Sequence, residues 1–305
     1  MLAPWLELPG VAEQVARFSE LAGMDLARLG TTADADEIRD SAVTQPLIVA
    51  MGLVTAGQLK LPAEDVVLAG HSIGEITAAA VAGVLPDEQA MSFATRRGAA
   101  MAAACAATPT SMVAVVGGDA DEVVAAIEAA GLTPANRNGS GQIVAAGALG
   151  GIATLTENPP ARARVRPLQV AGAFHTSYMA PAEEALRAVA AELRPADPTL
   201  TLLSNADGAV VDSGPEVLAR LVGQVTRPVR WDLCLDTMRK LGVTGTIELA
   251  PAGTLTGIAR RELSDVRLVA VKTPADLESA QRLLDEQATT TGDRQVAPLA
   301  TGMSE

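Results

Sequence analysis

The chain has 305 residues, 49% of them hydrophobic, so it can bury one large core or a large and a small one. Its formal net charge of −13 and its aromatic content of 2% argue against nucleic-acid binding, which needs basic surface and stacking rings. Two cysteines are too few for a disulfide framework or a zinc site, and we recognise no signal peptide or membrane-length apolar stretch. We therefore expect a cytoplasmic protein that does not bind membranes.

The first third of the chain predicts helices around one short strand. Helical spacing of apolar residues, or an apolar and Ala-rich composition, predicts helices at residues 11–22, 47–59, 76–84 and 87–106. Gln45-Pro46 is expected to interrupt the helical pattern ahead of the second of these. The apolar run Val66–Ala69 predicts a strand that leads directly into the third helix.

From residue 110 the predicted elements become shorter and follow the order β-α-β-β-α-β. The expected elements are strands at 112–116, 132–136, 142–146 and 165–170, and helices at 120–130 and 150–157. This order is typical of a ferredoxin-like unit. We predict that residues 110–172 form a small subdomain inserted into a large domain made of residues 1–109 and 173–286. Residues 287–305 have the composition of a disordered tail.

Strands and helices alternate again in the C-terminal half. Helices are expected at 181–192, 217–225, 232–241, 254–262 and 274–286, and strands at 200–205, 243–249 and 268–271. This alternation predicts an α/β fold: a parallel-sheet, α/β-hydrolase-like large domain carrying the ferredoxin-like subdomain. Sites in such sheets form at the carboxyl ends of strands, and Ser72 and Asn205 follow predicted strand ends.

The pentapeptide Gly70-His71-Ser72-Ile73-Gly74 lies between the predicted strand and its helix. A Gly-x-Ser-x-Gly sequence in that context is typical of a nucleophilic serine on a strained turn, with flanking glycines that let strand and helix pack closely. The backbone N–H of Ile73 would begin the helix and could point at a developing oxyanion. The alternative is an ordinary βα turn with a capping serine.

The chain contains only two histidines, His71 and His175. A serine nucleophile in acyl transfer or hydrolysis normally needs a histidine base. His71 adjoins Ser72, and neighbouring side chains tend to diverge, so His175 is the candidate base. The alternative is that His175 is a packed structural histidine.

Several separated motifs together resemble malonyl-CoA:acyl carrier protein transacylases. They are Gly70-His71-Ser72-Ile73-Gly74-Glu75, Arg97-Gly98 with Met101, Ala173-Phe174-His175-Thr176, Gln224 ahead of Pro228-Val229-Arg230-Trp231, and the segment Pro251–Gly257. The resemblance extends in order and spacing over about residues 1–285. Several motifs in register are more specific than one pentapeptide.

The resemblance implies a role for each matching residue. Ser72 would attack the malonyl thioester, and His175 would take its proton and return it to the leaving thiol. The backbone carbonyl of Gln224 would orient His175, and the Ile73 N–H would stabilise the oxyanion. Arg97 would bind the free malonyl carboxylate through paired hydrogen bonds, although an arginine on a helix more often makes a surface salt bridge.

Further substrate contacts are implied for His71, Met101, Phe174, Asn138 and Asn205. The Phe174 ring is expected to crowd an α-methyl branch and so to disfavour methylmalonyl groups. Asn138 would lie at the rim of the site, although its surrounding sequence also suits a polar hairpin turn. No metal or redox cofactor is implied, because the coenzyme A thioester is itself the substrate.

The beginning of the chain departs from the family pattern. Family members begin with a strand and a Gly-Gln-Gly-Ser-Gln-like turn that supplies half of the oxyanion hole, and Met1–Leu6 resembles what normally follows it. Loss of one oxyanion donor typically reduces the rate by about 10²–10³. Either the start of the chain is set too late, or this form is weak or inactive.

We therefore expect malonyl transfer from malonyl-CoA to the phosphopantetheine thiol of acyl carrier protein through a malonyl-serine, in fatty acid or polyketide biosynthesis. A serine esterase or thioesterase of the α/β-hydrolase type is the first alternative. It usually carries its histidine near the chain end, whereas about 130 residues follow His175 here. The second alternative is a scaffold that binds carrier protein or coenzyme A without turnover.

Overall fold

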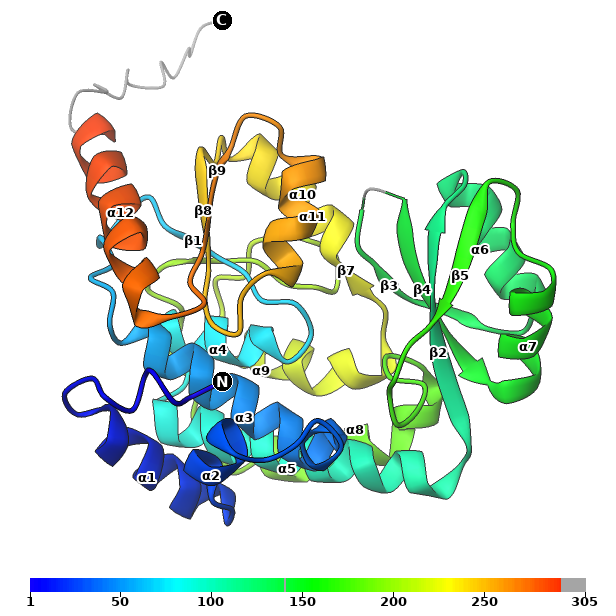
Figure 1. Ribbon diagram of the computed structural model, residues 1–305, viewed down its shortest axis with the longest axis horizontal. Helices are drawn as coiled ribbons and strands as arrows, with labels where there is room; N and C mark the ends of the chain where they lie inside the picture. The colour runs from blue at the N-terminus through cyan, green and yellow to red at the C-terminus, as the bar shows by residue number, and fades with distance from the viewer. Residues whose placement is uncertain (140, 292–305) are drawn as a thin grey trace, which may run out of the picture.

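The computed structural model describes residues 1–139 and 141–291. Figure 1 shows two parts side by side: a larger, mainly helical part, and a sheet of longer strands with two helices on its outer face. The larger part contains both the first and the last described elements of the chain, so the sheet is built from an internal segment. Among the described residues, no helix is both long enough and apolar enough to cross a membrane.

The helices are α1 Val11–Ala22, α2 Leu26–Thr31, η1 Glu37–Arg39, α3 Ser41–Ala56, α4 Gly74–Val81, α5 Asp87–Ala107, α6 Ala120–Ala129, α7 Leu149–Glu157, η2 Ser177–Met179, α8 Ala180–Ala190, α9 Gly214–Gly223, η3 Gln224–Thr226, α10 Trp231–Lys240, α11 Thr254–Glu262, η4 Pro274–Asp276 and α12 Leu277–Thr291. The strands are β1 Val67–Leu68, β2 Thr110–Gly117, β3 Thr133–Arg137, β4 Gln142–Ala148, β5 Ala163–Pro167, β6 Thr201–Leu202, β7 Val229–Arg230, β8 Gly245–Glu248 and β9 Arg267–Ala270.

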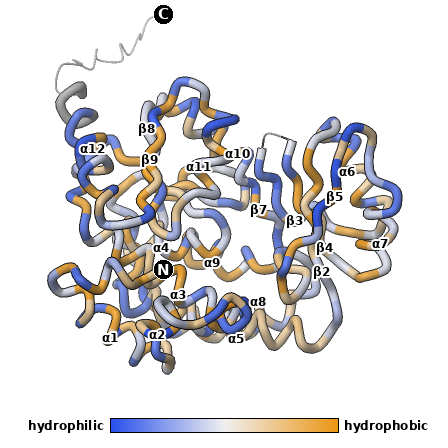
Figure 2. Tube along the Cα trace, in the orientation of Figure 1, coloured by the Kyte–Doolittle hydropathy of each residue, from blue (hydrophilic) through white to orange (hydrophobic). Residues whose placement is uncertain are grey.

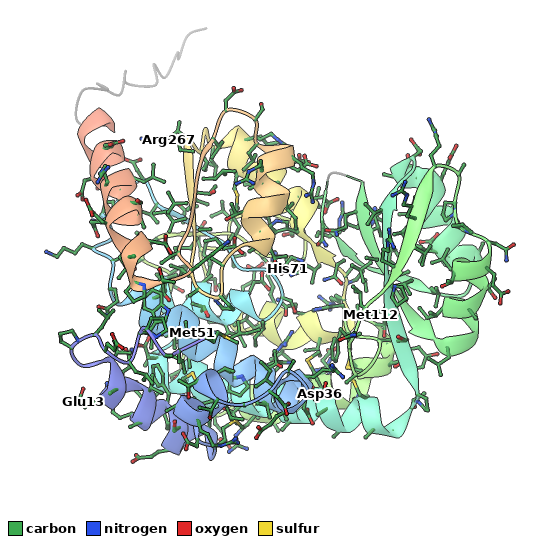
Figure 3. All side chains as sticks on the ribbon, viewed as in Figure 1. Glu13, Asp36, Met51, His71, Met112 and Arg267 are labelled. Carbon is green, nitrogen blue, oxygen red and sulfur yellow. The ribbon has the colours of Figure 1, made fainter. Side chains whose placement is uncertain are left out.

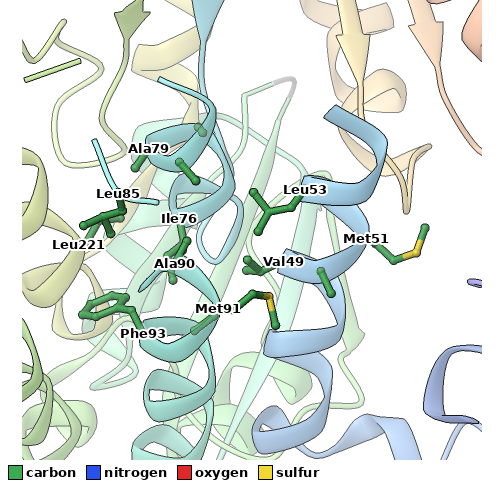
Figure 4. Packing of buried hydrophobic residues seen from close by; sticks show 14 of the residues in the cluster. Val49, Met51, Leu53, Ile76, Ala79, Leu85, Ala90, Met91, Phe93 and Leu221 are labelled. Carbon is green, nitrogen blue, oxygen red and sulfur yellow. The ribbon is translucent and has the colours of Figure 1, made fainter. Parts of the chain in front are cut away.

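The core of the larger part lies between α3, α4 and α5. Val49 and Leu53 of α3 point toward Ile76 of α4 and Met91 of α5, and all four side chains are buried (Figure 4). The α3 segment is apolar along most of its length (Figure 2), as expected for a helix covered on several sides. Burying each such side chain contributes roughly 1.5–3 kcal/mol, so this core fixes the helices that carry the site.

The parallel strands of the larger part form two short ladders. Strand β1 pairs in parallel with β6, and β8 pairs in parallel with β9. The parallel pairing confirms the α/β character expected from the alternating elements. The first ladder places the carboxyl ends of β1 and β6, and therefore Ser72 and Asn205, at one edge.

The second part is a mixed sheet with the strand order β5-β2-β4-β3-β7. All neighbours are antiparallel except β3 and β7, which pair in parallel from Asn136 with Val229. One face buries Val113 and Val115 against the helices α6 and α7. The other face buries Met112 and packs against Phe174, so the sheet forms one wall of the region around the catalytic candidates.

Two local predictions from the sequence were wrong, and one strand was not predicted. Pro46 does not interrupt a helix but lies inside α3, which begins earlier because the Asp40 side chain caps it by accepting from the Ala42 N–H. The sequence predicted no element at Val229–Arg230, which forms the strand β7 because the sheet edge offers it a partner in β3. Residues 287–291 continue α12 rather than starting a disordered tail, because each added helical residue gains a hydrogen bond. Residues 292–305 lie outside the described residues.

Candidate active site

The Ser72 turn has the strained geometry that its sequence predicted. Ser72 has φ 51°, in the left-handed region that non-glycine residues rarely adopt. A Cβ on Gly70 would lie 2.0 Å from the carbonyl carbon of Gly74, so this position has no room for a side chain. A Cβ on Gly74 would meet nothing within 4 Å. Close packing therefore requires only the first of the two glycines, whereas the sequence predicted that both were needed.

The Asn205 side chain stabilises this turn through two hydrogen bonds to its backbone. Its Oδ1 accepts a hydrogen bond from the Ser72 N–H at 2.8 Å, and its Nδ2 donates to the Gly70 carbonyl at 2.7 Å. The side chain is fully buried behind the end of β6. The structure thus places Asn205 in contact with the nucleophile turn and not among the residues that line the cavity described below.

Ser72 and His175 are in direct contact. The Ser72 Oγ lies 2.7 Å from His175 Nε2, and His175 Nδ1 lies 2.9 Å from the carbonyl oxygen of Gln224. Because a carbonyl only accepts, Nδ1 carries the proton and Nε2 is free to accept the serine proton. Burial, and then the positive charge of Arg97, lower the pKa of His175 to about 3, so its imidazole is neutral.

Arg97 projects from α5 toward the Ser72 hydroxyl and is only 1% exposed. Its Nη1 donates to Gln45 Oε1 at 2.5 Å, and its Nη2 donates to Gln224 Oε1 at 2.8 Å and to Ser72 Oγ at 3.3 Å. Burial lowers its pKa to about 10, while Glu75 opposes that shift, so the guanidinium stays charged. This depth rules out the surface salt bridge that an isolated helical arginine would suggest.

A cavity of about 310 Å³ opens over these groups. It brings together Ser72, Ile73, Arg97, Met101, Phe174 and His175, all of which were candidates from the sequence. Its outer wall includes Arg39, whose Nη2 donates to Gln169 Oε1 at 3.3 Å between the larger part and the segment after β5. A nucleophile, a neutral base and a buried cation therefore face one space, an arrangement suited to transferring an acyl group that carries a carboxylate.

His71 and Asn138 form a separate pair. His71 Nε2 lies 2.9 Å from Asn138 Oδ1, and its ring meets the edge of Trp231 with the centroids 5.7 Å apart. Burial lowers the pKa of His71. Figure 3 shows His71 near the junction of the larger part and the sheet. The pair therefore joins the Ser72 turn to the loop after β3, and the hydrogen bond of His71 Nε2 goes to Asn138, whereas the Ser72 hydroxyl contacts His175.

The sequence did not single out two polar residues that contact this machinery. Gln45 holds one side of Arg97, and Glu75 accepts from the side chain of Gln224. Both are buried, at 6% and 5% exposure. A charged or amide side chain inside an otherwise apolar helix is the signal that could have identified them, because such groups are seldom buried without partners.

Comparison with known proteins decides the family. Residues 11–291 match the model of the acyl transferase domain. The chain belongs to the acyl transferase family. Over 287 residues it is 55% identical to the malonyl CoA-acyl carrier protein transacylase of Mycobacterium tuberculosis, covering 93% of this chain and 95% of that relative.

Solved structures of acyl transferases share this fold. The crystal structure of MCAT from Mycobacterium tuberculosis matches with a TM-score of 0.88 and 54% identity, covering 92% of this chain and 94% of that one. A malonyl-transacylase in complex with a type II PKS acyl-carrier protein matches with a TM-score of 0.85 and 27% identity, covering 93% of this chain and 94% of that one. The architecture is thus that of the family.

Proposed function

We propose that this acyl transferase moves a malonyl group from malonyl-CoA to the phosphopantetheine thiol of acyl carrier protein, in fatty acid or polyketide biosynthesis. One observation carries the proposal: a guanidinium with no carboxylate partner among the described residues lies 3.3 Å from the Ser72 hydroxyl. The activity named for the relatives and the carrier-protein complex of a related structure support the same conclusion.

The first half-reaction makes a malonyl-serine. The Ser72 Oγ attacks the thioester carbonyl carbon, and its proton passes to His175 Nε2, which lies 2.7 Å away. The Ile73 N–H, at the start of α4, donates to the oxyanion of the tetrahedral intermediate. The carbon–sulfur bond then breaks, and the protonated His175 returns its proton to the coenzyme A thiolate.

The second half-reaction repeats these steps in reverse order with a new thiol. His175 takes the proton of the phosphopantetheine thiol, whose sulfur attacks the malonyl-serine carbonyl. The carbon–oxygen bond to Ser72 breaks, and His175 returns a proton to the serine. The Gln224 carbonyl orients the imidazole in both halves, and the chemistry requires neither a metal nor a redox cofactor, because the thioester supplies the activated acyl group.

Arg97 selects the acyl group. Its guanidinium would exchange amide partners for the malonyl carboxylate, and charge-assisted hydrogen bonds of this kind contribute on the order of 1.5–3 kcal/mol each. An acetyl group offers nothing to this cation and loses that contribution. Met101 and Phe174 form apolar walls of the cavity, and the Phe174 ring would crowd an α-methyl branch.

The remaining candidates act around the acyl pocket. We infer that Asn205 supports the nucleophile turn, since its hydrogen bonds go to Ser72 and Gly70. His71 and Asn138 would fix the rim of the site by joining the turn to the sheet. Any contact of these three side chains with substrate remains a prediction.

We also infer that residues 110–172 are a ferredoxin-like subdomain inserted between residues 1–109 and 173–286. The antiparallel order β5-β2-β4-β3, with α6 and α7 packed on one face, supports this division. Strand β7 extends the subdomain sheet from the large domain, which would hold the two walls of the site together.

A transfer assay tests the proposal. The purified chain is mixed with malonyl-CoA and holo acyl carrier protein, and the carrier is examined by mass spectrometry. We expect malonyl-loaded carrier with the wild type and none above background with Ser72→Ala. An esterase would instead hydrolyse simple esters without loading the carrier, and a scaffold would bind the carrier without loading it.

A further inference from the structure

We propose that Glu75 is a positioning residue for the acyl site. It acts through the side-chain amide of Gln224 and fixes the orientation of the Arg97 guanidinium without forming an ion pair with it. The inference rests on the proposed function, because it assumes that Arg97 receives the substrate carboxylate. It adds a fourth element to the nucleophile, base and cation of that site, namely a buried negative charge that orients the cation through an intervening amide.

Glu75 lies in the first turn of α4, three residues after the nucleophile, and is 5% exposed. Its Oε1 accepts a hydrogen bond from the backbone N–H of Asn205 at 2.5 Å. Its Oε2 accepts from Nε2 of Gln224. Both carboxylate oxygens are thus used to receive hydrogen bonds, and one of them faces the residue that also contacts Arg97.

The amide of Gln224 is held in one orientation by these partners. Its Nε2 donates to Glu75 and to the Ser72 carbonyl oxygen at 3.1 Å, while its Oε1 accepts from Arg97 Nη2 at 2.8 Å. A carboxylate and a carbonyl only accept, and a guanidinium only donates, so the reverse orientation would set donor against donor at Arg97. Glu75, together with the Ser72 carbonyl oxygen, therefore determines which end of the amide Arg97 meets.

The guanidinium of Arg97 remains available to a substrate carboxylate because Glu75 does not pair with it directly. No carboxylate of the described residues lies within 4.0 Å of an Arg97 nitrogen. A carboxylate paired directly with Arg97 would compete with the malonyl carboxylate for the same hydrogen bonds. The Gln224 amide lies between Glu75 and Arg97 and orients the guanidinium. The malonyl carboxylate can displace this amide at lower cost than it could displace a carboxylate, because the amide is neutral.

Arg97 is also the cation that compensates Glu75. Arg220 lines a small cavity together with Glu75, but its guanidinium is already paired with Asp207 and with Glu216 at 2.7 Å each. Burial raises the pKa of Glu75 to about 7, while hydrogen bonds from Asn205 and Gln224 and the charge of Arg97 oppose the shift. Assays at about pH 8 therefore keep this carboxylate ionised.

The first test is Glu75→Gln, which keeps the shape and removes one acceptor. If the new amide accepts from the Asn205 N–H, it turns its NH₂ toward the Gln224 NH₂. The Gln224 amide then either inverts and presents its NH₂ to Arg97, or stays and is pushed away by the donor that replaces the Glu75 carboxylate. We expect the ratio of malonyl-CoA to acetyl-CoA rates in Ser72 acylation to fall about tenfold or more. Labelling of Ser72 by a fluorophosphonate, which carries no carboxylate, should fall much less.

A double-mutant cycle shows whether Glu75 acts through the amide. Gln224→Met removes the side-chain relay and keeps the backbone carbonyl that orients His175. In that background, Glu75→Gln should have little further effect on the malonyl-to-acetyl ratio, because the connection to Arg97 is already cut. Full additivity of the two changes would overturn the proposal.

A matched control is Glu248→Gln. Glu248 is a carboxylate that caps the start of α11 by accepting from the N–H groups of Gly253 and Thr256, away from Arg97. We expect this variant to lower the melting temperature and leave the malonyl-to-acetyl ratio unchanged. A general loss of stability would lower Ser72 labelling in both variants and shift the ratio in neither.

The outcomes separate the two claims. If the wild type shows no malonyl preference, or Arg97→Ala keeps it, the proposed function itself fails. If that preference depends on Arg97 but survives Glu75→Gln, the positioning role is wrong and the function stands. Should Glu75→Gln fail to fold, Gln224→Met decides: a folded variant that keeps the full malonyl preference would overturn the proposal.

Discussion

Nδ1 of His175 lies 2.9 Å from the carbonyl oxygen of Gln224, so a neutral peptide group orients the imidazole beside Ser72. Such a partner fixes the tautomer without stabilising the charged ring as an aspartate would. Burial and the nearby charge of Arg97 lower the pKa of His175 and so favour the neutral imidazole. The neutral imidazole can therefore accept the serine proton. The resulting imidazolium is stabilised only while the negatively charged tetrahedral intermediate lies next to it.

This environment predicts an unusual pH profile. Because the pKa of His175 is lowered to about 3, the imidazole should remain neutral as the pH falls, and fluorophosphonate labelling of Ser72 should stay nearly constant from about pH 8 to 5. A histidine with an ordinary pKa of about 6.5 would lose roughly thirtyfold in rate over that range. Labelling rates measured across the range, with His175→Ala as the background control, would contradict the account if they fall with a midpoint near 6.5.

The two glycines of the nucleophile turn should respond differently to the same substitution. Gly70→Ala would press its new methyl group into the backbone of Gly74 and Glu75, so we expect severe loss of folded protein or of Ser72 reactivity. Gly74→Ala places its methyl group in open space and should be tolerated within about 1 kcal/mol. Chemical denaturation and fluorophosphonate labelling of both variants give the comparison. Equal damage from both changes would show that the turn is packed differently.

Asn205 should matter for the turn more than for the substrate. Asn205→Ala leaves the Ser72 N–H and the Gly70 carbonyl without their partner, and each unsatisfied buried group costs about 1–3 kcal/mol. We expect a clear drop in unfolding free energy and slower acylation with malonyl-CoA and acetyl-CoA alike. A selective rise in KM for malonyl-CoA, with stability unchanged, would instead assign Asn205 to substrate binding.

The sequence was most informative where chemistry requires a rare residue in a fixed local setting. Ser72 was recognisable because Gly-x-Ser-x-Gly lay between a strand and a helix, and His175 because only one other histidine exists. Arg97 needed the family resemblance, since nothing local distinguishes a buried arginine from an exposed one on a helix.

Other features depended on contacts that local sequence does not encode. Glu75 and Gln45 acquire their roles from Gln224 and Arg97, which are distant in the chain. Pro46 looked like an interruption because its cost to the helix is local, whereas the packing that offsets it comes from α5. Val229–Arg230 became a strand only because β3 offers it an edge.

The most direct test of the central claim is the intact mass of the chain after mixing with malonyl-CoA or acetyl-CoA. We predict that malonyl-CoA adds one malonyl group to the wild type, that Ser72→Ala gains none, and that acetyl-CoA reacts far more slowly. Arg97→Ala should lose this difference between the two thioesters, because the carboxylate no longer has a buried cation to meet. A malonyl adduct that survives Ser72→Ala, or an acetyl adduct formed as readily as a malonyl one by the wild type, would contradict the account.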